Sequence, residues 1–380
     1  EIKLKHRVCF VVSSSMTVNA FLQQPIKLLS SSYDIYVVAD FDKAATLQGL
    51  EGLVTILPVG IKRQISPWYD LLALWQLIRL FYKYRFSIVH SVTPKAGLLA
   101  MLAAAIAGIN IRIHTFTGQV WATKSGLARF MLKSFDKLIA CLSTNILVDS
   151  PSQRQFLLDE NDVNLHKSGV LLKGSISGVD LQKFKPNDEA RNRIRTSLSI
   201  VDNEVVFLFI GRLNRDKGVL DLAQAFFNVA HKHTNVRLLF VGVDEANLTE
   251  EIKRITLGCN EKVNFVSFTD LPQEYMAASD VLCLPSYREG FGNVVIEAAA
   301  VGLPTIGSKI YGVSDAVVDG QTGQLFEVRN VSALESCMAE LAQDDKLRNA
   351  LGKAAHKRAV EDFSSDKLSN AWLQYYQELS

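Results

Sequence analysis

The sequence predicts an α/β protein of two Rossmann-like domains, each built on a parallel, doubly wound sheet, and three observations support this fold class. The chain has 380 residues, which is enough for two cores of ordinary size. Short apolar runs alternate with longer amphipathic runs, as in consecutive β-α-β units. A segment rich in glycine and serine, Leu171 to Pro186, interrupts this alternation once, and the alternation then resumes.

The first half contains short apolar runs that we interpret as strands, at Val8–Val12, Ile35–Ala39, Val54–Leu57, Ile88–His90, Ile111–His114 and Asn145–Val148. The helical patterns between them are Ala20–Leu29, Leu71–Phe81, Leu98–Ala107 and Ala128–Ala140. No apolar run reaches the roughly 18 to 20 residues that a bilayer-spanning helix needs. The Ala-rich run from Gly97 to Ile109 is therefore predicted to be a buried core helix.

The second half repeats the pattern, with strands predicted at Val205–Ile210, Val236–Val241, Val263–Phe265, Val281–Leu284 and Pro304–Gly307, and helices at Val219–His231, Leu271–Ala278 and Asn293–Val301. The predicted domains are residues 1–172 and 173–363. Residues 364–380 form an amphipathic C-terminal helix, which we expect to cross back and pack on the N-terminal domain. Two such domains face each other across a cleft at the carboxyl ends of their strands, where α/β proteins bind ligands.

Composition narrows the class of protein. Apolar residues make up 48% and charged residues 21%, which excludes a disordered or collagen-like chain. The five cysteines include no close pair, so zinc-binding spacings and a disulfide framework are excluded and a reducing, cytoplasmic location is expected. Residues 1–170 carry 18 Lys and Arg against 11 Asp and Glu, which favours contact of the first domain with an anionic surface. Nothing in this charge pattern is typical of nucleic-acid binding.

Two glycine-containing loops carry the predicted chemistry. Ile210-Gly-Arg-Leu-Asn-Arg-Asp-Lys-Gly218 follows a strand and precedes a helix, with Arg212 and Lys217 placed to bind phosphate oxygens. Pro285-Ser-Tyr-Arg-Glu-Gly-Phe-Gly-Asn293 also joins a strand to a helix, whose free amides can bind phosphate. Its Glu289 and the helical Glu297 can reach different parts of one extended ligand.

Together these loops resemble those of family 4 glycosyltransferases. The resemblance includes Glu289-x7-Glu297 with its Gly-Phe-Gly core, Pro304 and the Asp319-Gly-Gln-Thr-Gly-Gln-Leu turn. In the first half, His90-Ser-Val-Thr-Pro-Lys-Ala-Gly-Leu-Leu99 and Gly178-Val-Asp-Leu-Gln-Lys-Phe184 look like the versions in bacterial capsule and O-antigen transferases. The match covers most of the chain and is specific for the family, but much less so for the sugar.

The resemblance implies a GT-B fold, transfer with retention of configuration and no essential metal or other cofactor. It implies that Arg212 and Lys217 neutralise the donor diphosphate and that Glu289 contacts hydroxyls of the transferred sugar. Glu297 is expected to hold the ribose. Backbone amides serve the sugar and phosphates, so the predicted donor-binding residues also include Gly211, Gly290, Phe291, Gly292 and Asn293.

The first half offers further candidates. His114 ends a strand and matches a family position implicated in acceptor or donor contact, so we assign it to the site without making it the base. His90 could touch the acceptor and Lys95 an acceptor pyrophosphate, the alternative for each histidine being a structural residue at a strand end. The family often has a glycine-rich loop after the first strand. Here that loop reads Ser13-Ser-Ser-Met-Thr-Val-Asn19, and we assign no individual roles in it.

Two other features are ambiguous. Asp40-Phe-Asp42 has the spacing of a metal-binding Asp-x-Asp motif, but it belongs to the wrong architecture and is interpreted as coincidence. In the stretch from Ile61 to Arg85, one helical face gathers Trp68, Leu72, Trp75, Ile78 and Tyr82, with basic residues at both ends. An interfacial membrane helix and a core-facing helix fit this pattern equally.

The predicted activity is α-forming transfer of an N-acetylhexosamine (GalNAc or GlcNAc) or a hexose from a UDP-sugar. The predicted acceptor is a polyprenyl-diphosphate-linked sugar in O-antigen or capsular polysaccharide synthesis, at the cytoplasmic face of the inner membrane. We expect the N-terminal domain to make peripheral contact with that membrane. A UDP-sugar 2-epimerase of the same fold and a non-catalytic nucleotide-sugar-binding protein remain as alternatives.

Overall fold

The computed structural model describes residues 5–41, 47, 49–62 and 66–379. The chain divides into two compact units, Glu1–Ser177 with Ser365–Ser380, and Gly178–Ser364. The first unit therefore runs to residue 177 rather than to the expected 172, and the C-terminal helix is part of it. Among the described residues no helix is long and apolar enough to cross a bilayer.

The first unit is built on one parallel sheet of seven strands in the order β3-β2-β1-β4-β5-β6-β7. The strands are β1 (Arg7–Ser14), β2 (Asp34–Asp40), β3 (Val54–Pro58), β4 (Ile88–Val92), β5 (Ile111–Phe116), β6 (Asn145–Val148) and β7 (Ser168–Gly169). The strand order reverses between β1 and β4, which is where ligands bind in sheets of this type. Val8–Val12 of β1 are fully buried, as expected for a strand covered on both faces.

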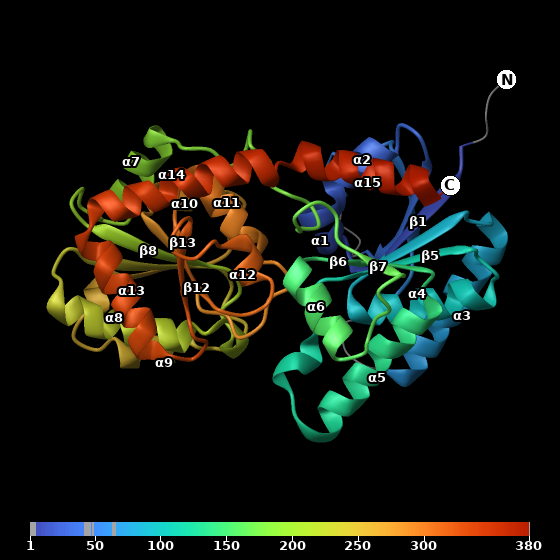
Figure 1. Cartoon of the computed structure of the whole chain (residues 1–380), viewed down its shortest axis with the longest axis horizontal. Coiled ribbons are helices and arrows are strands. Elements are labelled where there is room, and N and C mark those ends of the chain that lie inside the picture. Colours follow the sequence, from blue (N-terminus) through green and yellow to red (C-terminus); the bar gives the residue numbers. More distant parts are fainter. Residues whose placement is uncertain (1–4, 42–46, 48, 63–65, 380) are drawn as a thin grey trace. The chain divides into compact units, whose positions relative to one another are not determined.

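Helices cover both faces of this sheet (Figure 1). One layer holds α3 (Pro67–Tyr84), α4 (Pro94–Ile106), α5 (Gly126–Leu142) and α6 (Pro151–Asp159). The other holds α1 (Ser15–Thr17), the π-helical turn η1 (Val18–Leu22), α2 (Gln23–Leu29) and α15 (Ser365–Leu379). A short 3₁₀ turn, η2 (Val120–Thr123), precedes α5. The predicted core helix is α4, most of whose residues are buried.

The C-terminal helix is anchored to the first unit by a buried aromatic cluster. The Trp372 indole N–H donates to the carbonyl of Ile176 at 2.9 Å. His90 bonds through Nδ1 to the Tyr376 hydroxyl and through Nε2 to the Thr115 hydroxyl, both at 2.7 Å. Its ring stacks on Trp372. Because both ring nitrogens are occupied inside the core, the prediction that His90 touches an acceptor is wrong, and its role is structural.

The second unit has a parallel sheet of six strands in the order β10-β9-β8-β11-β12-β13. The strands are β8 (Val205–Ile210), β9 (Val236–Val241), β10 (Val263–Val266), β11 (Val281–Leu284), β12 (Thr305–Ser308) and β13 (Gly323–Phe326). The helices are α7 (Asp188–Ser197), α8 (Val219–Lys232), α9 (Thr249–Ile255), α10 (Pro272–Ala278), α11 (Asn293–Val301), α12 (Val313–Ala316), α13 (Val331–Gln343) and α14 (Asp345–Asp362), with 3₁₀ turns η3 (Arg215–Lys217) and η4 (Asn260–Lys262). The strand order reverses between β8 and β11.

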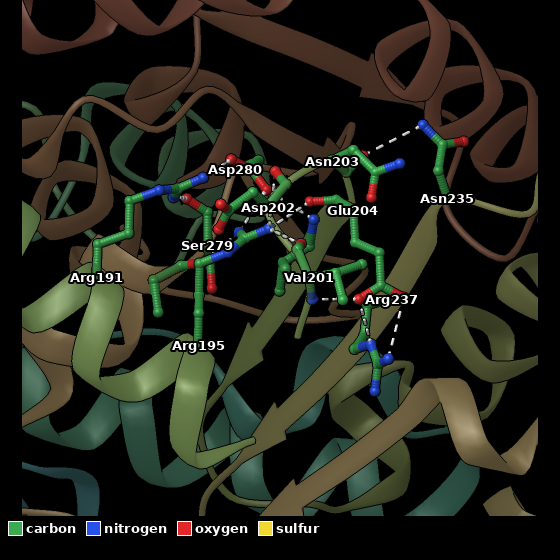
Figure 2. Close-up of polar contacts among 12 residues, drawn as sticks. Arg191, Arg195, Val201, Asp202, Asn203, Glu204, Asn235, Arg237, Ser279 and Asp280 are labelled. Atoms are coloured by element: carbon green, nitrogen blue, oxygen red, sulfur yellow. Dashed lines mark hydrogen bonds and ion pairs between the residues drawn. The ribbon is translucent and has the colours of Figure 1, made fainter. Parts of the chain in front are cut away.

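A polar network ties α7 to the amino ends of β8 and β11 (Figure 2). The buried Arg195 donates to the carbonyls of Ala278 and Glu204, at 3.1 and 2.7 Å. Asp280 accepts from Arg191 at 2.8 Å and from the backbone N–H of Val206 at 2.8 Å. Each buried charge is thus matched by hydrogen bonds, as burial requires. The network lies at the strand edge opposite the carboxyl ends and holds the sheet together there.

The two chain segments at the boundary of the second unit run side by side. The backbone N–H of Val179 donates to the carbonyl of Phe363 at 2.8 Å. Gly178 has a φ of +66°, and a Cβ there would lie 2.6 Å from that carbonyl oxygen. Only glycine combines this left-handed backbone with so close an approach. This is the physical reason for the glycine that opens the Gly178-Val-Asp motif.

Candidate active site

The two predicted donor loops follow β8 and β11, which are neighbours in the sheet. Parallel strands that adjoin at the reversal of strand order open a crevice at their carboxyl ends. The loops are joined by a hydrogen bond from the backbone N–H of Tyr287 to the carbonyl of Asp216, at 2.8 Å. Residues from two distant parts of the sequence therefore meet at one edge.

The first loop is a tight turn held by its own side chains. Asn214 accepts from the backbone N–H of Lys217 at 3.2 Å, which caps the 3₁₀ turn η3. Gly218 follows with a φ of +66°, and a Cβ there would lie 2.0 Å from the carbonyl oxygen of Pro285. Gly211 also packs without clearance, since a Cβ on Gly242 would lie 1.9 Å from the Gly211 carbonyl oxygen. These glycines let the loops approach at backbone distance.

The second loop leads into α11 through Gly292, which has a φ of +83° and caps the helix without a side-chain bond. Gly290 lies against Gly312, whose Cβ would fall 2.2 Å from the Gly290 carbonyl oxygen. The Phe291 side chain is buried and packs on Phe363, with ring centroids 5.2 Å apart. Phe291 can therefore serve a ligand only through its backbone. Asn293 opens the helix.

Lys217 and Glu289 form the centre of the site. The Lys217 ammonium lies 2.5 Å from Glu289 Oε1, and both side chains are mostly buried. The same carboxylate oxygen accepts from the Ser286 hydroxyl at 2.8 Å. Glu289 thus holds the ammonium in place and balances its charge, and an arriving diphosphate could take over that ammonium. Ser286 does not stand out in the sequence, because one serine in a loop carries no distinguishing pattern.

Arg212 lies in the first loop, but its side chain turns to another partner. The guanidinium donates to both carboxylate oxygens of Glu245, at 3.0 and 3.2 Å, from a half-exposed position. Exposed ion pairs contribute little stability, about 0 to 1 kcal/mol. The arm can therefore exchange Glu245 for a phosphate at small cost. Glu245 is a further residue that the sequence did not single out.

Glu297 lies within α11, half-buried, where burial raises the pKa of its carboxyl from 4.5 to about 7. The nearby Lys183 ammonium opposes that rise. A carboxyl with this pKa is partly protonated near neutral pH, and such shifts are common at functional sites. Glu297 thus lies in the same unit as Lys217 and Glu289, on the helix that follows the second donor loop.

His114 belongs to the first unit, at the carboxyl half of β5. Its Nδ1 bonds to the Ser91 hydroxyl at 2.8 Å, and its ring lies against Phe116. A Cβ on Gly97 would fall 2.4 Å from the ring, so α4 must carry glycine there. Burial lowers the pKa of His114 from 6.5 to about 3, which keeps the imidazole neutral. Among the described residues Nε2 has no hydrogen-bond partner, so it is the atom left for a ligand.

The remaining first-unit candidates have structural partners. Lys95 pairs with Asp70 at 2.7 Å. Ser13, the first residue of the serine-rich segment, accepts a hydrogen bond from the Thr93 hydroxyl at 3.3 Å. This bond joins the ends of β1 and β4. Thr93 has a φ of +80°, a strained value for a β-branched residue. This strain lies where the strand order of the first sheet reverses.

Within the described parts of the chain, no three His, Cys, Asp or Glu side chains gather closely enough to hold an ion. Asp40 is exposed at the end of β2, and its partner in the Asp-x-Asp pattern, Asp42, lies outside the described residues.

The chain matches family models and characterised relatives over nearly its whole length. A model described as "Glycosyl transferase 4-like domain" matches residues 6–164, and one described as "Glycosyl transferases group 1" matches residues 190–358. The capsular polysaccharide biosynthesis glycosyltransferase CapM of Staphylococcus aureus is 31% identical over 94% of this chain and 93% of its own. An Escherichia coli protein named UDP-Gal:alpha-D-GlcNAc-diphosphoundecaprenol alpha-1,3-galactosyltransferase is 27% identical over 80% of this chain and 78% of its own.

Solved structures agree in fold. Sucrose-phosphate synthase of Thermosynechococcus elongatus aligns with a TM-score of 0.84 and 20% identity, covering 99% of both chains. Anabaena HepE, solved in complex with UDP-glucose, aligns with a TM-score of 0.81 and 17% identity, covering 98% of this chain and 99% of its own. Together with the family models and the relatives, these likenesses show that the chain belongs to family 4 of the glycosyltransferases, has the GT-B fold and is a glycosyltransferase.

Proposed function

We propose that this enzyme transfers a sugar from a UDP-sugar to a polyprenyl-diphosphate-linked sugar, with retention of configuration and without an essential metal. The observation that carries the proposal is the cluster of Lys217, Glu289 and Ser286 where β8 and β11 adjoin. A fixed ammonium there meets the negative charge that develops on the leaving diphosphate. The names of CapM and of the galactosyltransferase support a role in capsular polysaccharide synthesis on a lipid-linked sugar. Assembly of O-antigen or capsule at the cytoplasmic face of the inner membrane is part of the proposal.

The reaction breaks the bond between the anomeric carbon and the β-phosphate oxygen, and it forms a bond from that carbon to an acceptor hydroxyl oxygen. The bonding pair of the broken bond leaves with UDP, and the acceptor proton passes to the departing phosphate on the same face of the sugar. Lys217 and Arg212 stabilise the leaving group, and Glu289 binds hydroxyls of the transferred sugar. His114, neutral because of its burial, offers Nε2 to the sugar or the acceptor without acting as a charged group.

The first experiment is a nucleotide-release assay with UDP-, GDP- and ADP-sugars, including UDP-GalNAc, UDP-GlcNAc, UDP-galactose and UDP-glucose. Each donor is tested with and without a short polyprenyl-diphosphate sugar, in the presence of EDTA. We expect acceptor-dependent UDP release from one donor, unaffected by EDTA, and an α-linked product by NMR. Epimerisation of a UDP-sugar without acceptor, or donor binding with no product, would contradict the proposal.

Donor binding is expected to strengthen as pH rises, because Glu297 accepts from ribose hydroxyls best when ionised. With a pKa of about 7, the carboxyl is ionised in about one molecule in ten at pH 6 and about nine in ten at pH 8. The Kd for UDP should then fall by about tenfold over that range. Titration calorimetry at several pH values measures this dependence.

The matched variant is Glu297→Gln, which removes the titrating group and should leave only the pH dependence of UDP itself. The same shift affects stability in the opposite direction. Because the folded pKa is raised, the stability linked to protonated Glu297 is complete below pH 4.5 and is lost as pH rises through about 7. If log Kd for UDP changes equally with pH in the wild type and in Glu297→Gln, Glu297 does not bind the ribose.

A further inference from the structure

Two helices of the first unit, α3 and α5, carry large apolar side chains on their outer faces. On α3 these include Trp68, Leu71 and Trp75, and on α5 Leu127, Phe130 and Met131, all exposed. In the sequence only the α3 stripe stands out. The core-facing interpretation of that stripe is wrong, because the α3 residues in the core are Ala73, Leu77 and Phe81.

The two stripes point to the same side of the unit. Both helices pack through their opposite sides on one face of the sheet, with α4 between them (Figure 1). On α5 the exposed residues recur at three- and four-residue spacing, while the buried Asp136, Ile139 and Ala140 lie across the helix from them. The result is one apolar surface, here named the α3–α5 face. Soluble monomers rarely expose so many large apolar side chains together.

The charged groups that α3 and α5 expose are cations, of which Lys137 pairs with the buried Asp162 at 3.7 Å. Two half-buried cations of α5, Arg129 and Lys133, pair with Glu160. Exposed cations on and beside the two helices are Lys62, Arg79, Lys83, Arg85, Lys124 and Lys137. The two acidic residues between 66–85 and 124–142 are both occupied. Asp70 pairs with Lys95, and the buried Asp136 accepts from the Trp121 indole N–H at 2.8 Å. Two of the cations also lie over aromatic rings, Lys62 over Tyr69 and Arg79 over Trp75.

We propose that the α3–α5 face docks on the surface of an anionic lipid bilayer. Indole and phenyl rings enter the boundary between headgroups and acyl chains, while Lys and Arg ammonium and guanidinium groups meet lipid phosphates. A second copy of this chain is a poorer occupant. A two-fold interface would set the same cations against each other. This docking surface rests on the proposed function, because a lipid-linked acceptor is the reason for the enzyme to bind a membrane. Its residues are not those of the donor site.

The test uses the full chain and sedimentation with vesicles of phosphatidylcholine alone or with one third phosphatidylglycerol. We expect stronger binding to the anionic vesicles, weakening as salt is added. Leu127→Ser/Phe130→Ser should lower the partition coefficient by about tenfold or more. Arg79→Gln/Lys83→Gln should lower it by about fivefold per charge, and only on anionic vesicles.

A matched control comes from the second unit. Leu127 and Phe130 are 73% and 69% exposed, and Leu257 and Phe268 are 72% and 64% exposed. Leu257→Ser/Phe268→Ser removes similar exposed apolar area and should leave vesicle binding unchanged. Circular dichroism and thermal unfolding confirm that each variant is folded.

The proposal is overturned if the wild type does not bind anionic vesicles at low salt, or if the control variant loses as much binding as Leu127→Ser/Phe130→Ser. It is also overturned if ultracentrifugation finds a dimer that this variant dissociates, since a second copy then covers the face. An assay of sugar transfer distinguishes failure of the docking proposal from failure of the proposed function. Transfer to a short, water-soluble acceptor should be equal in the wild type and Leu127→Ser/Phe130→Ser. Vesicle binding by a chain that transfers no sugar would refute the proposed function and leave the docking surface standing.

Discussion

Replacing Lys217 with alanine is expected to lower kcat/KM for sugar transfer by about 10²- to 10³-fold. The ammonium lies 2.5 Å from Glu289 in a mostly buried position, so its charge is little screened by solvent. The variant removes the positive group that offsets charge on the leaving diphosphate. It also leaves Glu289 without its cation, which repels the donor further.

Initial rates over a range of donor concentrations measure this effect. Lys232→Ala is the control, because Lys232 pairs with Glu335 on α13, away from both loops, and is largely exposed. We expect Lys232→Ala to keep wild-type kinetics. Most of the Lys217→Ala loss should appear in kcat, since the charge that Lys217 meets grows in the transition state. A kcat/KM within threefold of wild type would show that Lys217 does not act on the diphosphate.

Gly218→Ala is expected to damage both stability and activity. A Cβ at this position would lie 2.0 Å from the carbonyl oxygen of Pro285, and the backbone φ of +66° is strained for alanine. Left-handed strain and overpacking each cost about 1 to 3 kcal/mol. The collision pushes apart the loops that carry Lys217 and Glu289. A misplacement of about 1 Å between catalytic groups can lower the rate by about 100-fold.

Gly320→Ala separates the two causes. Gly320 has a φ of +70°, close to that of Gly218, but a Cβ there has no atom within 4 Å. It therefore shows the left-handed strain alone, about 1 to 2 kcal/mol. We expect Gly218→Ala to lower the melting temperature well beyond Gly320→Ala and to reduce kcat/KM, which Gly320→Ala leaves near wild type. Similar melting temperatures and rates in the two variants would mean that the loops tolerate the collision.

The sequence predicted much of the second unit to the residue. Val205–Ile210, Val236–Val241, Val281–Leu284 and Asn293–Val301 have the same bounds in the structure. Strands buried on both faces are continuous apolar runs, which stand out from their surroundings. The sequence does not predict α14, because its buried residues are mostly small and lie in a largely polar run: Leu351, Gly352, Ala355 and Ala359. β7 has only two residues, and β13 (Gly-Gln-Leu-Phe) begins with glycine and glutamine instead of forming an apolar run.

The donor loops were predicted as separate motifs, and the sheet brings them together. Lys217 and Glu289 are 72 residues apart, and they meet because β8 pairs with β11 on one side as well as with β9, the next strand in the chain, on the other. The second partner of that carboxylate, Ser286, lies three residues away in the same loop. The Arg212 partner, Glu245, follows β9, the other neighbour of β8. Single polar residues in loops have no periodicity, so only their tertiary position identifies them.

The two histidines show where sequence information ends. His90 and His114 each lie near the carboxyl end of a strand, and their local patterns are alike. In the parallel register His90 pairs with Ile113 and Ser91 with His114. Because side chains alternate between faces along a strand, the two imidazoles lie on opposite faces of the sheet. The C-terminal helix covers the face of His90 and bonds its Nδ1 through Tyr376, while Thr115 of β5 bonds its Nε2. His114 keeps Nε2 free of protein partners among the described residues.

The sequence by itself determined the alternation of strands and helices, the two parallel sheets and the motifs of the family, because these depend on local periodicity and on short runs of residues. Only the tertiary structure decided which charged groups meet and which histidine is structural. It also decided which apolar side of α3 is exposed, and that α5 presents a second such stripe beside it. An apolar stripe has the same sequence pattern whether it is buried in a core or exposed to solvent. Which of the two occurs depends on how elements distant in the sequence pack together.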